Sequence, residues 1–226
     1  MRRILVFGLG VYGMQLVRTL SRLGAHVVAV DADRKIIEQV KRLVPEAVVA
    51  DASDRGALQA LEVDRADAAV VCLGDNFESA EICVVHLREL GCRRIIARAT
   101  TEERADILEA LGPDQVITPT LAEARKMGQI LMTPNVVDYA RLFGGRSIVL
   151  YRAPEAFVGK KLSDLKLGTR FKAFTVGLQH RSEARSGSVD SGIDFRPTPD
   201  HVVQEGDLLY IMGYDEDLLR LASRYS

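Results

Sequence analysis

The stretch ILVFGLGVYG, at residues 4–13, is a short apolar strand that runs directly into a glycine-rich turn. A second apolar strand follows a helical pattern and ends at Asp31. Gly8 permits the tight turn, Gly10 lets backbone N–H groups approach a phosphate, and Gly13 lets the helix pack closely on the strand. An acidic residue about 20 positions after such a turn is typical of a dinucleotide-binding unit, where it binds a ribose. The start of the chain therefore predicts a nucleotide site; the alternative is a packing turn without a ligand.

Apolar strands alternate with amphipathic helical patterns, which predicts a doubly wound, Rossmann-like α/β fold with a parallel sheet covered by helices on both faces. Strands are expected at residues 3–7, 26–30, 47–50, 68–72, 94–98 and 115–118. Helices are expected at residues 11–23, 34–43, 55–61, 77–90, 102–111, 121–131 and, after Pro134, 135–142. The expected N-caps are Asp33, Asp54, Asn76 and Thr101, and the expected helix-ending glycines are Gly24, Gly91 and Gly112.

The pattern changes at Gly144 and Gly145, after which the sequence is strand-rich. We therefore expect a nucleotide-binding domain at residues 1–143 and a second, smaller α+β domain at residues 144–226. Its expected elements are strands at 147–152, 173–179 and 207–212, helices at 162–165 and 216–223, and a turn-prone tract at 181–192. This domain is too short for the substrate domain of a dehydrogenase and suits a regulatory or dimerising module.

Lysine and arginine number 30 against 31 aspartates and glutamates, without a basic block. This balance argues against binding to nucleic acid or to an anionic membrane surface. No run of about 18 apolar residues occurs, and glycines interrupt the apolar start, so neither a membrane span nor a signal peptide is expected. With 47% hydrophobic residues, the chain is expected to form a globular core and to lie in the cytoplasm.

The cysteines and histidines suggest neither a disulfide framework nor a metal site. Cys72, Cys83 and Cys92 form no CxxC pair and are expected to be reduced and mostly buried. The 4 histidines have no ligand spacing, so no metal site is predicted. The sequence has no GxSxG turn and no Tyr followed four residues later by Lys, and the second domain has no spacing that suggests a His–carboxylate dyad. The chain is therefore expected to be a nucleotide-binding module without catalytic residues.

Further candidates lie where the other strands end, because ligands of open α/β sheets bind at the carboxyl edge. Residues 51–53 and 73–76 follow two strands, with helix caps and a simple turn as the alternatives. Arg98 ends a strand where it would meet a phosphate; the alternative is an exposed glutamate partner. Carboxylates at Asp31 and Asp33 would repel a 2′-phosphate, so NADP is not expected. The candidate nucleotide-binding residues are Gly8, Leu9, Gly10, Val11, Tyr12, Gly13, Asp31, Ala32, Asp33, Asp51, Ala52, Ser53, Leu73, Gly74 and Arg98.

Ordered motifs extend over essentially the whole chain. They are GLGVYG (8–13), VAVDAD (28–33), VVADASD (48–54), ARAT (97–100), VITP (116–119), TPNVVDY (133–139), FVGKKLSDL (157–165) and PDHVVQEGDLLYIMG (199–213). With these motifs the chain resembles the regulatory subunit of Trk/Ktr-type potassium uptake systems (TrkA/KtrA-like), which joins an RCK (regulator of potassium conductance) N-domain to a small RCK C-domain. The glycine turn alone is shared with many dehydrogenases, whereas the ordered set is fairly specific.

The resemblance implies a regulator without catalysis. Subunits of this family pair and assemble into a cytosolic ring, commonly an octamer, at the inner face of the cell membrane beneath a membrane-embedded potassium-translocating partner. ATP, ADP, AMP or NAD(H) in the Rossmann cleft changes the shape of the ring, and in some members the C-domain binds cyclic di-AMP. The apolar run Ile82, Cys83, Val84 and Val85 agrees with burial against another subunit, and the alternative is packing within its own domain.

Two departures from the family pattern bear on the choice of nucleotide. Val11 stands where many relatives place an arginine that reaches the terminal phosphate of ATP, and Thr120 stands where many carry a glutamate tied to cation or nucleotide binding. Glu123, three residues later, is expected to face elsewhere on its helix. Without the arginine the charge pairing that favours ATP is weakened, so ADP, AMP and NAD(H) are serious candidates.

Two other functions fit the same nucleotide fold. One is a small NAD-dependent oxidoreductase, which needs a proton donor at its substrate; the other is a nucleotide sensor of a different cation transporter, such as a proton antiporter. A second ligand in the C-domain also stays open. His180 and Arg181 end a predicted strand where a basic side chain would meet a cyclic dinucleotide, and the alternative is a solvated strand end.

Overall fold

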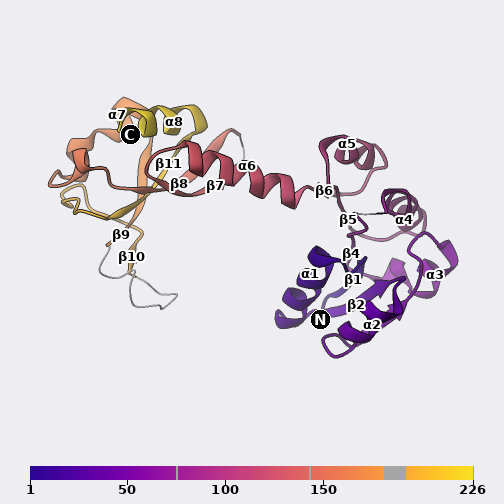
Figure 1. The fold of residues 1–226 in the computed structure, drawn as a ribbon. Helices are drawn as coiled ribbons and strands as arrows, with labels where there is room; N and C mark the ends of the chain where they lie inside the picture. The colour runs from indigo at the N-terminus through magenta and orange to yellow at the C-terminus, as the bar shows by residue number, and fades with distance from the viewer. Residues whose placement is uncertain (75, 143, 181–191, 226) are drawn as a thin grey trace. The chain divides into compact units, whose positions relative to one another are not determined.

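The structure, a computed structural model, describes residues 1–74, 76–142, 144–180 and 192–225. Asp75, Arg181 and most of the turn-prone tract expected at 181–192 therefore lie outside the described residues. The chain divides into two compact units, Met1–Glu123 and Ala124–Ser226 (Figure 1). None of the helices within the described ranges combines the length and the apolar character that a bilayer crossing needs.

The first unit contains a six-stranded parallel sheet in the order β3-β2-β1-β4-β5-β6 (Figure 1). Its strands are β1 (Arg3–Phe7), β2 (His26–Asp31), β3 (Glu46–Val49), β4 (Ala68–Val71), β5 (Ile95–Arg98) and β6 (Gln115–Ile117). All neighbouring pairs run parallel, and β1 pairs with both β2 and β4. The doubly wound, Rossmann-like fold is confirmed, with small shifts at the ends of the predicted strands.

Helices connect these strands: α1 (Val11–Arg22), α2 (Arg34–Val40), α3 (Arg55–Ala60), α4 (Phe77–Glu89), α5 (Glu102–Ala110) and, after β6, α6 (Pro119–Met132). The predicted N-caps are confirmed, because each accepts a hydrogen bond from a backbone N–H of the following turn: Asp33 from Lys35, Asp54 from Gly56, Asn76 from Ser79 and Thr101 from Arg104. The predicted glycines Gly24, Gly91 and Gly112 follow their helices in the left-handed conformation. Local sequence therefore determines where these helices begin and end.

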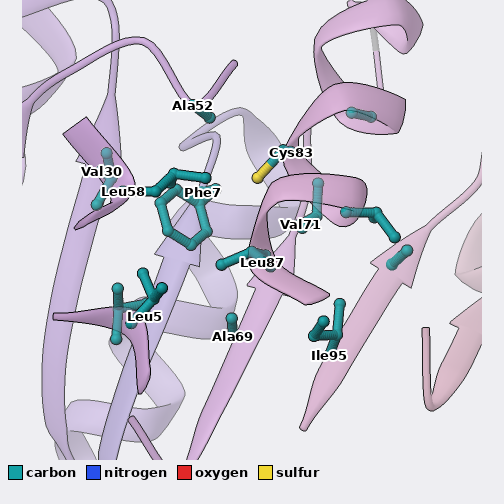
Figure 2. Close-up of a cluster of buried hydrophobic side chains, with 14 of the residues drawn as sticks. Leu5, Phe7, Val30, Ala52, Leu58, Ala69, Val71, Cys83, Leu87 and Ile95 are labelled. Carbon is teal, nitrogen blue, oxygen red and sulfur yellow. The ribbon is translucent and has the colours of Figure 1, made fainter. Parts of the chain in front are cut away.

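Helices α3, α4 and α5 pack on one face of the sheet. Phe7, Leu58, Cys83 and Leu87 belong to the apolar cluster that they bury, which Figure 2 shows between the strands and the helices. The apolar run of α4 is thus divided: Cys83 and Leu87 are in the unit's own core, whereas Ile82 is 36% exposed. Of these residues, the exposed Ile82 remains available for contact with a second subunit.

The cysteines are free thiols, as predicted, and two of the three are buried. Burial raises the pKa of Cys72 to about 12. Burial also raises the pKa of Cys83. Both thiols are therefore protonated near neutral pH, which makes them poor nucleophiles and agrees with a packing role.

Helices α1 and α2 pack on the opposite face of the sheet, where their buried side chains join Val6, Val27 and Ala29. A cavity of about 440 Å³ lies beside α1 on this face, with Leu16, Leu20, Val70, Ile96 and Ile117 in its lining. Helices therefore lie on both faces of the sheet of the first unit, as predicted.

The second unit contains a five-stranded antiparallel sheet in the order β10-β9-β11-β8-β7. Its strands are β7 (Val136–Arg141), β8 (Arg146–Arg152), β9 (Phe174–Gln179), β10 (Ile193–Asp194) and β11 (Leu208–Tyr214). The described part of this unit also contains the portion of α6 from Ala124 onward, helices α7 (Leu167–Phe171) and α8 (Asp215–Arg224), and short 3-10 turns at Glu155–Phe157 and Leu162–Leu165. Tyr151, Phe157, Leu209 and Ile211 are fully buried in its core. The predicted α+β character is confirmed.

The helix predicted at residues 135–142 is wrong, because residues Val136–Arg141 form strand β7 and pair antiparallel with β8. Two β-branched valines and a tyrosine favour a strand, and Val136 and Tyr139 pack against the core of the second unit. The proline before the segment resembles a helix start but leads into an extended edge strand instead. Because β7 belongs to the second sheet, the division between the units lies earlier in the chain than the boundary expected between residues 143 and 144.

Candidate functional site

The glycine turn lies at the carboxyl edge of the parallel sheet, at the point where the strand order reverses. From β1 the chain proceeds to β2 and β3 on one side, and then crosses to β4 on the other side of β1. The turn is fixed from both sides: Gly8 N donates to Val30 O at 2.9 Å, and Cys72 N donates to Phe7 O at 2.7 Å. This reversal is where open α/β sheets bind ligands, because the flanking loops diverge there.

The three glycines of the turn differ in the space around them. Gly8 has φ +87°, a conformation that L side chains rarely adopt. A Cβ on Gly13 would overlap the carbonyl oxygen of Gly8, so the helix and the turn are in direct backbone contact. A Cβ on Gly10, in contrast, would meet nothing within 4 Å. The backbone is therefore open at Gly10, where the sequence predicts that a phosphate approaches.

Helix α1 begins at this opening without a side-chain cap. Gly10 is the N-cap, and the first turn holds no acidic residue. The first intrahelical bond runs from Met14 N to Gly10 O at 2.9 Å, which leaves the earlier N–H groups without partners inside the helix. Such N–H groups and the positive end of the helix dipole favour an anion. The side chain of Val11 is 95% exposed and brings no charge to this position.

Asp31 connects the end of β2 to the glycine turn. Its Oδ2 accepts a hydrogen bond from Leu9 N at 2.7 Å, and its Oδ1 accepts one from Asp33 N at 2.8 Å. Each carboxylate oxygen has a second acceptor position, so these bonds leave capacity for ribose hydroxyls. Asp33 instead caps α2 through Lys35 N, and Ala32 lies exposed between the two aspartates. Asp31 therefore stabilises the conformation of the glycine turn and is also available to bind a ligand.

The segment after β3 is an aspartate turn. Asp51 Oδ1 accepts hydrogen bonds from Ser53 N at 2.8 Å and from Ser53 Oγ at 2.7 Å. The Ser53 hydroxyl and then its amide hold the pKa of the Asp51 carboxyl below its usual value. Ala52 is buried in the core, so its side chain packs inside the unit. The turn directs a charged carboxylate toward solvent at the carboxyl edge.

Arg98, at the end of β5, lies against the loop that follows β4. The carbon of its guanidinium is 5.5 Å from the centre of the Tyr12 ring. Its Nη1 is 2.5 Å from the position that a Cβ on Gly74 would take, so a side chain there would displace the guanidinium. The Arg98 Nε atom is buried without a hydrogen-bond partner, and none of the ion pairs among the described residues involves this guanidinium. The expected alternative, a glutamate partner, is not present in the described part of the chain.

Arg104 is a residue of this edge that sequence reasoning missed. Its Nη1 donates to Gly74 O and to Thr100 Oγ1, both at 2.9 Å. Its guanidinium carbon also lies 4.9 Å from the centre of the Phe77 ring. Arg104 thus connects α5 to the loop after β4 through the carbonyl of Gly74. The spacing of four residues from Thr100 is a signal in the sequence, but it does not reveal the contact with Gly74.

The structure therefore brings the sequence-predicted residues of five strand ends to one edge. The glycine turn with Asp31, the Asp51 turn, and Gly74 with Arg98 belong to loops that follow neighbouring parallel strands. Ala52 packs into the core, and Asp33 caps a helix. What remains toward solvent is an open backbone at Gly10, between a carboxylate on one side and a guanidinium on the other.

The second unit contains a His–carboxylate pair that the sequence spacing did not predict. His180 Nδ1 lies 3.0 Å from Asp207 Oδ1, and His201 lies on the other side of the same carboxylate. The two residues are 27 positions apart, so the sequence has no short spacing that would reveal the pair. His180 follows β9 and Asp207 precedes β11, so the sheet register, rather than sequence spacing, brings the two residues together.

Comparison with known families agrees with this geometry. The TrkA-N domain matches residues 4–119, and the TrkA-C domain matches residues 148–225. The chain belongs to the TrkA-N domain family. Its resemblance to Trk/Ktr-type regulatory subunits is thereby confirmed. The chain is homologous to Ktr system potassium uptake protein C of Bacillus subtilis, with 25% identity over 219 residues that cover 97% of this chain and 95% of the relative. Ktr system potassium uptake protein A of the same organism is 26% identical over 219 residues, which again cover 97% of this chain and 95% of the relative.

Solved structures support the fold of this TrkA-N family member. The GsuK channel bound to NAD superposes with a TM-score of 0.69 at 20% identity, over 98% of this chain. This chain spans 39% of the GsuK chain. The Kef C-terminal domain of Shewanella denitrificans in its AMP-bound form gives a TM-score of 0.50 at 23% identity and covers 58% of this chain and 80% of that one. At these identities the likeness shows the fold.

Proposed function

We propose that this chain is a non-enzymatic regulatory subunit that binds a nucleotide at the edge around Gly10 and controls a membrane-embedded potassium transporter or channel. The observation that carries this proposal is the TrkA-N and TrkA-C pair over nearly the full length of the chain, together with the similarity of 97% of the chain to two Ktr potassium uptake proteins. The lengths agree closely, since the match covers 95% of the KtrC relative. The chain itself is then cytoplasmic and reaches the inner face of the membrane through its partner.

The geometry of the edge supports a ligand with a ribose and one or two phosphates. The uncapped start of α1 at Gly10 receives a phosphate, and Asp31 accepts hydrogen bonds from ribose hydroxyls. Arg98, whose Nε is buried without a partner, supplies positive charge on the other side. The binding residues are those predicted at the carboxyl edge, with Ala52 and Asp33 contributing to packing and capping.

ADP, AMP and NAD(H) fit this edge better than ATP. Val11 extends into solvent without charge where an arginine would pair with a terminal phosphate, and Thr120, at the start of α6, offers no carboxylate for a cation. Fold relatives agree with this set, since GsuK structures carry NAD or ADP and the Kef domain carries AMP. The family resemblance supports a further regulatory ligand, such as cyclic di-AMP, in the second unit.

Two apolar surfaces support assembly of the chain into dimers and then into a ring, for which an octamer is the expected size. Helix α6 has no buried residue, and it exposes apolar side chains: Met127 by 46% and Leu131 by 76%. In the first unit, the cavity beside α1 is lined by apolar side chains of β4, β5 and β6. Apolar surfaces of this kind are typical of interfaces between subunits. A ring gives the nucleotide a means of control, because it shifts the equilibrium between ring shapes by its difference in affinity for them.

Thermal unfolding with ATP, ADP, AMP, NAD, NADH and cyclic di-AMP, with the mass of the same samples measured by light scattering, tests this proposal. A ligand at about 100 times its dissociation constant stabilises the folded state by roughly 2.7 kcal/mol, which a shifted midpoint reveals. We expect ADP, AMP or NAD(H) to raise the midpoint of an oligomer without being consumed. Consumption of NADH with a reduced product would instead identify an oxidoreductase. Absence of any shift would contradict nucleotide binding.

A membrane partner is tested by purification of the tagged chain from detergent-solubilised membranes of its own cells. We expect a potassium-translocating protein to co-purify, and mass spectrometry identifies it. Recovery of a proton antiporter instead would assign the chain as the nucleotide sensor of a different transporter.

A further inference from the structure

Two histidines and a buried aspartate converge at one end of the sheet of the second unit. His180 directly follows β9, and Asp207 directly precedes β11; these strands are antiparallel with Gln179 opposite Leu208. The register therefore places His180 and Asp207 opposite each other at the strand ends. His201 lies in a separate turn, where its backbone N–H donates to Thr198 O at 3.0 Å. Three segments far apart in the sequence thus meet at this point.

The donor atoms of these side chains lie close enough to share one cation. His180 Nδ1 is 3.0 Å from Asp207 Oδ1, and His201 Nε2 is 4.0 Å from Asp207 Oδ2. One donor atom from each of the three residues lies within 4.8 Å of the other two. The imidazole rings are near each other as well, with centroids 5.1 Å apart. Two imidazole nitrogens and a carboxylate oxygen are a common ligand set for zinc.

The surroundings of the cluster leave one buried polar atom without a partner among the described residues. The Asp207 side chain is 1% exposed, and its carboxylate contacts His180 Nδ1 and accepts a hydrogen bond from Gln204 N, without a permanent positive charge beside it in the described part of the chain. The Nε2 atom of His201 is buried and has no hydrogen-bond partner among the described residues. A divalent cation between the three side chains would compensate the carboxylate and occupy the free lone pair of His201.

We propose that His180, His201 and Asp207 form a binding site for a divalent transition-metal cation, with Zn²⁺ as the expected metal. Three protein ligands leave one tetrahedral position open to water or to a donor from another molecule. Zinc–nitrogen bonds of about 2.0–2.1 Å place tetrahedral donors about 3.3 Å apart, so the donors must approach one another by an ångström or so. The side chains of His180 and His201 are 29% and 21% exposed, so both rings reach the surface, whereas the donor atom His201 Nε2 is itself buried.

A backbone N–H group orients the Asp207 carboxylate, as hydrogen bonds commonly do for metal-binding carboxylates. Gln204 N donates to Asp207 Oδ2 at 2.8 Å, which fixes the orientation of the carboxylate and leaves its second lone pair for a cation. The alternative is a His180–Asp207 hydrogen bond that only stabilises the strand ends. That alternative gives His201 no role, because His201 Nε2 is 4.0 Å from the carboxylate, beyond hydrogen-bond distance.

Metal titration of the full chain, stripped of metal with a chelator, distinguishes these possibilities. Zn²⁺ is titrated by calorimetry, and Co²⁺ is used as a spectroscopic probe, since tetrahedral Co²⁺ gives intense visible d–d bands. We expect one Zn²⁺ per chain. His180→Gln and His201→Gln are each expected to weaken Zn²⁺ binding by more than the 10–100-fold that loss of a supporting residue typically causes.

Two further variants keep the result interpretable. His26→Gln is the matched control, because His26 forms a histidine–carboxylate pair with Glu46 at 2.8 Å in the first unit; its Zn²⁺ affinity is expected to equal that of the wild type. His201→Cys preserves a ligand, so it is expected to bind Co²⁺ with a new thiolate charge-transfer band. Absence of Zn²⁺ binding in the wild type would overturn the proposal, as would unchanged affinity in the His180 and His201 variants.

Discussion

Asp31 is the residue with the most consequences at the candidate site, because it holds the glycine turn and faces the expected ribose. Asp31→Ala removes acceptors for Leu9 N and Asp33 N and also the ribose carboxylate. We expect nucleotide affinity to fall by about 10-fold or more, since hydrogen bonds to a charged group contribute about 1.5–3 kcal/mol. Calorimetric titration with ADP and NAD measures this effect.

Asp67→Ala is the matched control for Asp31→Ala. Asp67 also accepts a hydrogen bond from a backbone N–H, that of Arg3 at 2.8 Å, but it lies where β4 begins rather than at the carboxyl edge. We expect its nucleotide affinity to match the wild type. Equal affinity in Asp31→Ala and Asp67→Ala would remove Asp31 from the site.

The Asp51 turn makes a prediction about pH. Its hydrogen bonds from Ser53 hold the pKa of the Asp51 carboxyl below its usual value, so their stabilising contribution is present above the usual pKa and is lost as pH falls through the lowered one. Ser53→Ala removes the hydroxyl donor and should raise the pKa of Asp51 toward its usual value. NMR titration of the carboxyl carbon measures this pKa, and an unchanged value would show that the hydroxyl has no part in the shift.

Single residues were predicted from sequence where their roles are local. The N-caps and helix-ending glycines depend on the backbone of one turn, so Asp54, Asn76 and Gly91 could be read directly from the sequence. The pairing of His180 with Asp207 depends on strand register across 27 residues, which single-sequence spacing does not encode. Arg104 was missed for the same reason, because its partner Gly74 lies 30 residues earlier.

At the scale of elements, substitutions at two glycines near the start of α1 are expected to affect nucleotide binding and stability differently. Gly10→Val places a side chain in open space, so we expect a loss of at most about 1 kcal/mol in the free energy of unfolding but a loss of nucleotide binding. Gly13→Ala forces its Cβ onto the Gly8 carbonyl, so we expect destabilisation of about 3 kcal/mol or more. Chemical denaturation and calorimetric titration of both variants check this contrast, and nucleotide binding by Gly10→Val equal to wild type would contradict the phosphate position.

A partly buried polar contact connects strand β7 to β8 and to the start of α8 in the second unit. Tyr139 OH and Ser147 Oγ both donate to Asp215 Oδ1, at 3.0 and 2.6 Å, and Ser147 is fully buried. Ser147→Ala leaves Asp215 with one donor fewer, so the free energy of unfolding should fall by about 1–3 kcal/mol. Denaturation of Ser163→Ala, a change at an exposed serine of the same unit, is the control and should match the wild type.

The sequence misassigned β7 because proline and a following apolar run are compatible with a helix start as well as with a strand. What decides between them is tertiary: β8 offers a free edge, and Val136 and Tyr139 reach the core of the second unit. The parallel strands of the first unit were predicted well, because short apolar runs differ clearly from the amphipathic helices between them, although only the central strands are largely buried.

At the scale of the whole molecule, the order of the two domains is the strongest argument for function. A Rossmann-like sheet alone is shared by enzymes and regulators, so it decides little. The second, antiparallel unit and the TrkA-C match are compatible with nucleotide binding by the first unit. They indicate a regulatory protein. Under the proposed function, the sequence could not predict which membrane protein is controlled, because a partner is recognised through surface shape and charge that single-sequence motifs do not reveal.

The central claim is that nucleotide binding by this chain controls potassium transport, and potassium uptake measured in cells that naturally encode it tests the claim most directly. The chain is deleted and then replaced by the wild type or by Gly10→Val, with expression of both confirmed. We predict that deletion lowers uptake at limiting external potassium, that the wild type restores it, and that Gly10→Val does not. Unchanged uptake after deletion, or full restoration by Gly10→Val, would contradict the claim.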